Sequence, residues 1–309
     1  MNPTPDIMGL PVVTAIIPTF NSAHFLPNAV DSVLAQSVSD VEVLVVDDGS
    51  TDGTPDVLSG YGSKVRGFRQ ENTGVAVARN RGLAEARGRY VAFLDADDTW
   101  EPQKLERQLA ALAGSSCRAS YTAYTAVTAA LAPVEVRRFP PRGPVRERLL
   151  CAGNVIGTPS TVLAERDLFA EVGGFDPALS QCADWDMWVR LSSRTDFLYV
   201  DEPLVRYRVH DGNMSRNLLL LEADSERVLA KAFAAPDMPA GLRARRRAAL
   251  AYNAMVLAGS YLHAANYRAA ARCLVRSLML DPARVGYAAA FPARILNRWT
   301  ARRQPAGRP

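Results

Sequence analysis

The sequence predicts an α/β fold, in which helices flank a mostly parallel β-sheet, followed by an extension made only of helices. Two observations support this prediction. In the first two thirds of the chain, short β-branched runs alternate with helical patterns, as in right-handed β-α-β units. After about residue 215 the strand patterns stop and only helical patterns continue. We therefore expect two domains, residues 1–214 and residues 215–309.

The first elements repeat as strand and helix four times. Each strand is a short apolar run, and each helix has apolar residues three and four positions apart. The predicted strands cover residues 12–17, 41–46, 65–69 and 90–94. The predicted helices cover residues 26–36, 54–58, 75–86 and 102–113, and Pro102 suits the first turn of the last one. Parallel strands need such crossovers, so this order predicts a parallel sheet.

The remaining elements are less regularly spaced. Prolines between residues 133 and 144 indicate a hairpin or a loop. Further strands are predicted at residues 116–127, 160–163, 197–200 and 204–209. Further helices are predicted at residues 165–172, 184–194, 218–233, 243–263 and 267–280.

Composition excludes several classes of protein. The chain has 309 residues, 48% hydrophobic and 22% charged, which is typical of a globular protein and not of a disordered or fibrous one. No apolar run is long enough for a membrane-spanning helix, and the start of the chain does not resemble a secretory signal. The four cysteines are far apart and form no CxxC pair, so we expect neither a zinc ribbon nor disulfides, and we expect a cytoplasmic protein.

The charge is unevenly distributed along the chain. Residues 1–210 carry 20 Lys and Arg against 26 Asp and Glu, whereas residues 211–309 carry 16 against 6. An acidic part can collect carboxylates around a metal ion, and a basic part can meet an anionic membrane surface. The alternative is that the arginines only coat solvated helix faces.

Several catalytic motifs are absent from the sequence. There is no GxxxxGK[ST], HExxH or GxSxG, which argues against a P-loop nucleotidase, a zinc protease of that type and an α/β-hydrolase. Gly60 and Gly62 begin a GxG pattern, but Val65 stands where a dinucleotide-binding motif needs a third glycine.

Polar residues follow three of the predicted strands, at residues 18–21, 47–48 and 95–98. In open parallel sheets, ligands bind outside the carboxyl ends of the strands. Asp95 and Asp97 are two apart and can share a hard divalent cation such as Mg²⁺ or Mn²⁺. The alternative is that this segment only caps the helix beginning near Pro102.

Two further residues have both a functional and a plain interpretation. Asp48 can accept the ring N–H of a uracil-type base, or it is only a turn residue in Asp-Gly-Ser. Arg79 is one turn inside a helix that begins after Gly74, where it can reach a base or a phosphate, or it is a surface arginine.

Taken together and in order, these segments resemble the inverting family 2 glycosyltransferases of the GT-A fold. The resemblance covers roughly residues 12–210. It is carried by IIPTFN at 16–21, VDDGSTDGT at 46–54, ENTGVAVARNRG at 71–82, YVAFLDADD at 90–98 and GGFDPALSQCADWDMWVRL at 173–191. The resemblance implies a Rossmann-like GT-A sheet and a divalent metal. It also implies transfer of a sugar from a nucleotide diphosphate to an acceptor hydroxyl, with UDP-sugars favoured.

The resemblance also implies roles for single residues. Pro18 and Phe20 match positions that meet the nucleotide base, and Asp48 matches the base-binding aspartate. Asp95 and Asp97 match a DxD motif, with Asp95 nearer the ribose and Asp97 the metal ligand.

Two more residues match the end of the family pattern. Asp184 matches the aspartate that serves as general base, although Ala183 stands where the family has a glutamate. His210 resembles a histidine that completes the metal site, or it is a surface histidine. The missing glutamate keeps open a non-catalytic, nucleotide-sugar-binding scaffold. A nucleotidyltransferase is disfavoured, because residues 18–28 contain no Lys, Arg or Gly for a triphosphate loop.

The helical pattern of the C-terminal part indicates a packing or membrane-contact function. Residues 257–282 have spacings similar to one tetratricopeptide helix pair, which should pack on the catalytic domain or on a partner. Two basic groups could contact anionic lipid beside a carbohydrate or lipid-linked acceptor, at the inner face of a membrane. They are Arg243, Arg245, Arg246 and Arg247, and Arg294, Arg298, Trp299, Arg302 and Arg303. No nucleic-acid-binding motif accompanies them, so no nucleic-acid partner is expected.

Overall fold

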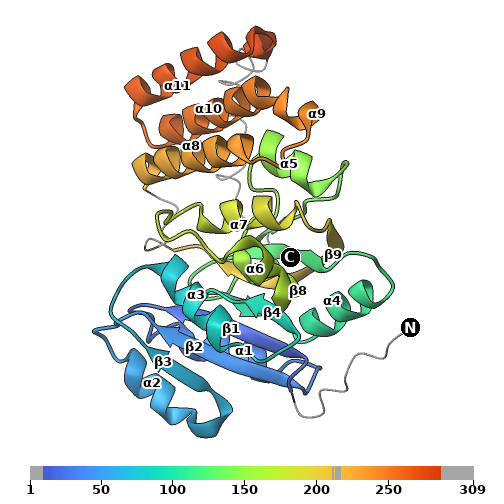
Figure 1. The fold of residues 1–309 in the computed structure, drawn as a ribbon. Coiled ribbons are helices and arrows are strands. Elements are labelled where there is room, and N and C mark those ends of the chain that lie inside the picture. Colours follow the sequence, from blue (N-terminus) through green and yellow to red (C-terminus); the bar gives the residue numbers. More distant parts are fainter. Residues whose placement is uncertain (1–9, 211, 213–216, 287–309) are drawn as a thin grey trace, which may run out of the picture. The chain divides into compact units, whose positions relative to one another are not determined.

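The computed structural model describes residues 10–210, 212 and 217–286 (Figure 1). The chain divides into two compact units: unit 1 holds residues 1–149 and 154–216, and unit 2 holds residues 150–153 and 217–309. The boundary between residues 216 and 217 is two residues from the division predicted at 214. The sequence did not predict that residues 150–153 belong to the helical unit.

Unit 1 is built on a sheet whose first half is parallel. In spatial order, its strands are β3 (Arg66–Arg69), β2 (Val41–Asp47), β1 (Val13–Thr19) and β4 (Tyr90–Phe93). All seven residues of β1 are buried. A parallel strand that is covered on both faces needs a nearly continuous apolar run, which is why the sequence predicted this half well.

The second half of the sheet has mixed strand directions. It continues from β4 through β8 (Leu163–Glu165), β6 (Ala119–Val127), β9 (Phe197–Arg208) and β5 (Thr99–Trp100), and β7 (Pro133–Arg137) pairs with β6. β8 is antiparallel to both β4 and β6, while β9 is parallel to β6. The hairpin alternative is confirmed, because β7 is antiparallel to β6.

Some predictions in this half were wrong in detail. The two strands predicted at 197–200 and 204–209 are one strand, β9, whose register against β6 shifts near Ala123. Such a bulge absorbs extra residues without ending the strand. The strand predicted at 160–163 lies at β8, because Pro159–Thr161 forms a 3₁₀ turn. The two-residue β5 was not predicted.

Seven helices are described in unit 1 (Figure 1): α1 (Leu26–Leu34), α2 (Thr54–Gly60), α3 (Val75–Glu85), α4 (Lys104–Ala113), α5 (Val145–Cys151), α6 (Arg166–Val172) and α7 (Ala183–Leu191). The sequence did not predict α5, whose last residues extend into unit 2. α1 buries Leu26, Ala29, Val30 and Val33, the apolar face of an amphipathic helix. α3 packs closely on β1, where a Cβ at Gly82 would lie 2.4 Å from Ile16 Cγ2.

Unit 2 contains α8 (Leu218–Ala234), α9 (Ala240–Arg243), α10 (Arg246–His263) and α11 (Tyr267–Leu280), and α10 lies between α8 and α11 (Figure 1). The helix predicted at 243–263 therefore has a break before Arg246. Its core comprises Leu257, Ala258, Tyr261, Ala270 and Cys273.

A third helix covers the predicted tetratricopeptide-like pair. Leu218 and Leu221 of α8 pack against its core, and Tyr261 Oη donates to Glu222 Oε2 at 2.7 Å. Part of the face that we expected the catalytic domain or a partner to cover is therefore covered by α8.

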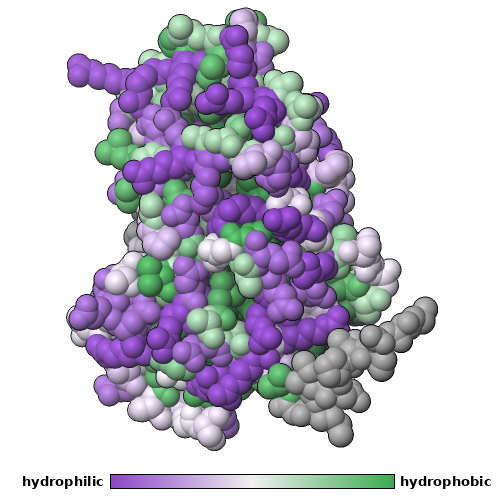
Figure 2. Space-filling view, in the orientation of Figure 1, coloured by the Kyte–Doolittle hydropathy of each residue, from purple (hydrophilic) through white to green (hydrophobic). Residues whose placement is uncertain are grey.

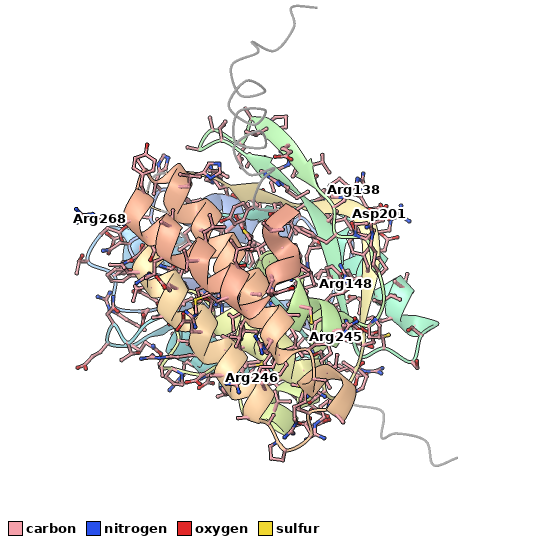
Figure 3. The ribbon with its side chains drawn as sticks, turned by 90° about the horizontal axis from the view of Figure 1, so that it is seen from above. Arg138, Arg148, Asp201, Arg245, Arg246 and Arg268 are labelled. Carbon is pink, nitrogen blue, oxygen red and sulfur yellow. The ribbon has the colours of Figure 1, made fainter. Side chains whose placement is uncertain are left out.

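Several arginines of unit 2 hold its helices together. Arg272 pairs with Glu222 at 2.6 Å, and Arg276 pairs with Glu226. The first predicted basic group lies between the end of α9 and the first turn of α10, and its four members are exposed: Arg243, Arg245, Arg246 and Arg247 (Arg245 and Arg246 are labelled in Figure 3). The second predicted basic group, Arg294 to Arg303 with Trp299, lies outside the described residues.

The surface of the described residues carries no extensive apolar area in the view of Figure 2, where hydrophobic residues form small areas between hydrophilic ones. Among these residues, no helix is both long and apolar enough to cross a membrane.

Candidate functional site

The carboxyl ends of β1 and β2 lie side by side and position the first polar residues. Thr19 is paired with Asp47 in the sheet, and the backbone N–H of Asp48 donates to the Thr19 carbonyl oxygen at 2.8 Å. Phe20 follows β1 and is 46% exposed, whereas Pro18 is buried within the strand. Of these two predicted base contacts, Phe20 is the side chain that is open to a ligand.

Asp48 fixes the loop between β3 and α3. Its Oδ1 accepts from Thr73 N at 3.0 Å and from Gln70 Nε2 at 2.8 Å, and its Oδ2 accepts from Gly74 N at 2.8 Å. The turn role belongs to Asp47, whose Oδ1 accepts from Ser50 N at 2.8 Å. The plain interpretation of Asp48 as a turn residue is therefore wrong. Its carboxylate has further lone pairs that a ligand could use.

Arg79 and Asp95 form an ion pair in which the arginine is buried and the aspartate is partly exposed. Arg79 is only 5% exposed, and its Nη2 lies 2.7 Å from Asp95 Oδ1. The guanidinium also lies over the ring of Phe175, with 5.5 Å between Cζ and the ring centroid. The interpretation of Arg79 as a surface arginine is wrong, because its charge is buried and paired.

Asp97 and His210 face each other, as the predicted metal pair requires. His210 Nε2 lies 2.9 Å from Asp97 Oδ2, and its Nδ1 accepts from Gly212 N at 3.1 Å. Burial, and the nearby charge of Asp95, raise the pKa of Asp97. The helix-cap alternative is wrong, because the N-cap residue of α4 is Gln103.

The donor set of this pair is compatible with a divalent metal ion once the hydrogen bond from Gly212 N to His210 Nδ1 is released, because Nε2 can bind a metal only when Nδ1 carries the proton. A carboxylate and an imidazole together suit Mn²⁺ better than Mg²⁺, which prefers oxygen ligands alone. A cation would also favour the ionised form of Asp97, which burial and Asp95 oppose. Within the described ranges, no group of three or more His, Cys, Asp or Glu side chains is placed to hold a metal. Phosphate and water oxygens would have to complete the coordination.

Sequence reasoning missed Asp98, Ser160 and Arg208, which support this loop. Asp98 is fully buried, and its carboxylate accepts from Ser160 Oγ at 2.6 Å and from Arg208 N at 2.9 Å. Arg208 Nε donates to the Asp97 carbonyl oxygen at 2.6 Å, and its guanidinium lies 4.7 Å from the Phe25 ring centroid. The sequence offered two signals for these residues: Asp98 is a third carboxylate in the DADD run, and Arg208 stands two residues before His210.

Asp184 is in the first turn of α7 and is 8% exposed. Its Oδ2 accepts from Asn154 Nδ2 at 2.8 Å, and its Oδ1 accepts from Trp185 N at 2.7 Å. Burial raises its pKa to about 6, although the charge of Arg79 and both hydrogen bonds act in the opposite direction. Ala183 is buried beside it and supplies no second carboxylate.

These residues form one electrostatically connected group. Asp95 is paired with Arg79 and raises the pKa of Asp97, and the charges of Arg79 and Asp95 both act on Asp184. Asp48 holds the loop that begins α3, the helix carrying Arg79. Among the described residues, no hydrogen bond or ion pair joins Pro18, which is buried in β1, or the exposed Phe20 to this group.

Comparison with known proteins gives a consistent result. A model of glycosyl transferase family 2 matches residues 14–173. The putative teichuronic acid biosynthesis glycosyltransferase TuaG of Bacillus subtilis is 35% identical over 213 residues, covering 67% of this chain and 82% of that protein.

Two solved structures have a similar fold. Mannosyltransferase PcManGT from Pyrobaculum calidifontis, solved in complex with GDP-Man and Mn²⁺, is 22% identical with a TM-score of 0.61, covering 96% of this chain and 81% of that one. Residues 1–349 of S. aureus TarS are 16% identical with a TM-score of 0.61, covering 85% of this chain and 90% of that one.

Proposed function

The chain belongs to glycosyl transferase family 2, and from this premise we propose that it moves a sugar from a nucleotide diphosphate to an acceptor hydroxyl with inversion at the anomeric carbon. It has the GT-A fold and is a glycosyltransferase, as the sequence predicted. We further propose a UDP-sugar donor and a role in cell-surface polysaccharide synthesis. The similarity to TuaG supports that role.

We assign the donor to the edge of the sheet formed by β1, β2 and β4. Phe20 and Asp48 would meet the base, and Arg79 and Asp95 the ribose and phosphates. Asp97 and His210 would hold Mn²⁺ or Mg²⁺. When bound, the cation would stabilise the negative charge on the departing diphosphate.

Asp184 would act as general base. Its carboxylate takes the proton of the acceptor hydroxyl, whose oxygen forms the new bond to the anomeric carbon as the bond to the diphosphate oxygen breaks. The nucleoside diphosphate leaves from the face opposite the attacking hydroxyl and keeps the electron pair of the broken bond. A pKa of about 6 leaves Asp184 ionised at neutral pH, yet more basic than an ordinary aspartate.

The observation that supports this proposal most is the Arg79–Asp95 pair: the charge of Asp95 acts on Asp97, and the charges of both residues act on Asp184. The test is a thermal-shift screen with UDP-, GDP- and TDP-sugars, with and without Mn²⁺. We expect a metal-dependent rise in melting temperature with one UDP-sugar, followed by slow release of UDP. Equal melting temperatures with every donor would refute the donor assignment.

The acceptor is proposed to be a carbohydrate or a lipid-linked glycan, reached by peripheral contact of unit 2 with an anionic membrane. The proposal rests on 16 Lys and Arg against 6 Asp and Glu in residues 211–309. The pairing of Arg272 and Arg276 with glutamates reduces the charge available for this contact. Flotation with anionic vesicles tests it, and recovery of all protein in the unbound fraction would contradict it.

A further inference from the structure

The first turn of α7 is tied to both ends of the short segment 150–153. Asp184 Oδ2 accepts from Asn154 Nδ2 at 2.8 Å, just after this segment. Its neighbour Trp185 donates from Nε1 to the carbonyl oxygen of Leu149 at 2.9 Å, just before it. Two consecutive residues of α7 are therefore anchored to the chain where it leaves and re-enters unit 1. The direction of the Asp184 carboxylate depends on this anchor.

The orientation of Asn154 is fixed by a second hydrogen bond. Its Oδ1 accepts from Ile156 N at 3.3 Å, two residues further along the chain, as in an Asx turn. Because the carbonyl oxygen is used in this way, the amide NH₂ group must face Asp184. Asn154 therefore presents a donor, and not an acceptor, to the carboxylate.

We infer that Asn154 is a positioning residue, which holds the Asp184 carboxylate in the orientation that leaves its remaining lone pairs free for the acceptor hydroxyl. This inference rests on the proposed role of Asp184 as general base. Ala183, the residue before Asp184, has no polar side chain that could orient the aspartate. The contact with Asn154 comes from a different part of the chain.

The charged groups and donors around Asp184 determine whether its pKa rises or falls when Asn154 is replaced. Arg79, from α3, favours its ionised form, whereas Asp95, after β4, opposes it. The hydrogen bond from Asn154 adds to the effect of Arg79, because a donor stabilises a carboxylate more than a neutral carboxyl group. Loss of this donor should therefore raise the pKa of Asp184.

Two variants of Asn154 separate its hydrogen bond to Asp184 from its hydrogen bond with Ile156 N. Asn154→Ala removes both hydrogen bonds, whereas Asn154→Asp retains the acceptor for Ile156 N and replaces the donor by a second carboxylate. Thr161→Val is the matched control, because Thr161 Oγ1 donates to the carbonyl oxygens of Ile156 and Thr158 in the same loop without contacting Asp184.

The first readout needs neither donor nor acceptor. In protein labelled with ¹³C at the aspartate carboxyl carbons, the resonance missing from Asp184→Asn identifies Asp184. We expect its NMR titration midpoint near 6 in the wild type. The midpoint should rise by about 0.5 to 1 pH unit in Asn154→Ala, and further in Asn154→Asp. It should be unchanged in Thr161→Val. A wild-type midpoint in Asn154→Ala would overturn the inference.

The second readout is release of UDP from the sugar nucleotide selected by the donor screen. In Asn154→Ala we expect a loss of about two- to fivefold at pH 6 that largely recovers by pH 8, because a shift of about 0.5 to 1 unit lowers the ionised fraction by these factors. Its affinity for UDP should be unchanged. If the wild type releases UDP from no sugar nucleotide, the proposed function fails, while the NMR titration still decides the role of Asn154.

Discussion

Replacing Asp184 with asparagine should stop transfer and at the same time stabilise unit 1 at neutral pH. The carboxylate is 8% exposed, and burial raises its pKa from 3.8 to about 6. The folded protein therefore holds the proton more tightly than the unfolded chain does. The stability associated with this proton is fully present below pH 4 and is lost as the pH rises to about 6.

The size of this stability difference follows from the shift in the pKa of Asp184. A difference of two pKa units corresponds to about 3 kcal/mol of unfolding free energy above pH 6. Asparagine cannot ionise, but it offers one acceptor oxygen instead of two to Trp185 N and Asn154 Nδ2, which costs about 1–2 kcal/mol. The net gain of Asp184→Asn over the wild type at pH 8 should therefore be about 1–2 kcal/mol. About 1.4 kcal/mol of the difference should develop between pH 5 and pH 8, since one of the two units lies in that interval.

Urea unfolding, followed by tryptophan fluorescence, measures this difference. Three of the four tryptophans, Trp100, Trp185 and Trp188, lie in unit 1, so in a Trp299→Phe background the signal reports on the unit that holds Asp184. Asp186→Asn is a matched control, because Asp186 is on the same helix and pairs with Arg190 at 2.7 Å. That control should be destabilised at pH 8. The reasoning is refuted if Asp184→Asn is also destabilised, with a difference from the wild type that does not change with pH.

Three further substitutions test the site and the packing of unit 1. Asp97→Ala should remove the Mn²⁺-dependent part of UDP affinity, measured by calorimetry with and without EDTA; full retention of the metal effect would contradict its role as ligand. Asp48→Asn should weaken UDP binding and destabilise unit 1 by about 1–2 kcal/mol, because one backbone N–H in the loop before Gly74 loses its acceptor; unchanged urea midpoints would argue against this. Gly88→Ala should destabilise unit 1 by about 1–3 kcal/mol, because the new Cβ would lie 2.4 Å from Thr14 N; wild-type stability would show that this backbone can shift.

The parallel half of the sheet could be predicted from the sequence, because buried parallel strands are continuous apolar runs. β1 and β2 begin and end within two residues of their predicted bounds. The other half could not be predicted in the same detail. β5 is two residues long, and β9 continues through a bulge that the sequence pattern does not reveal.

The candidate site could be predicted only where a residue type and its place at a strand end coincide. Asp97 and His210 were proposed as a pair, and the structure brings them within 2.9 Å. Asn154 and Arg208 were missed, because their roles depend on contacts with residues 30 and 111 positions away, respectively. A single sequence gives no signal for such contacts.

Asp97 and His210 are proposed to hold a metal ion beside a sugar-nucleotide site. Crystals grown with Mn²⁺ and UDP, measured at the manganese absorption edge, would show whether they do. We expect one anomalous peak within coordination distance of Asp97 Oδ2 and His210 Nε2. A peak coordinated only by other residues of unit 1, with UDP away from Asp48, would contradict the proposal.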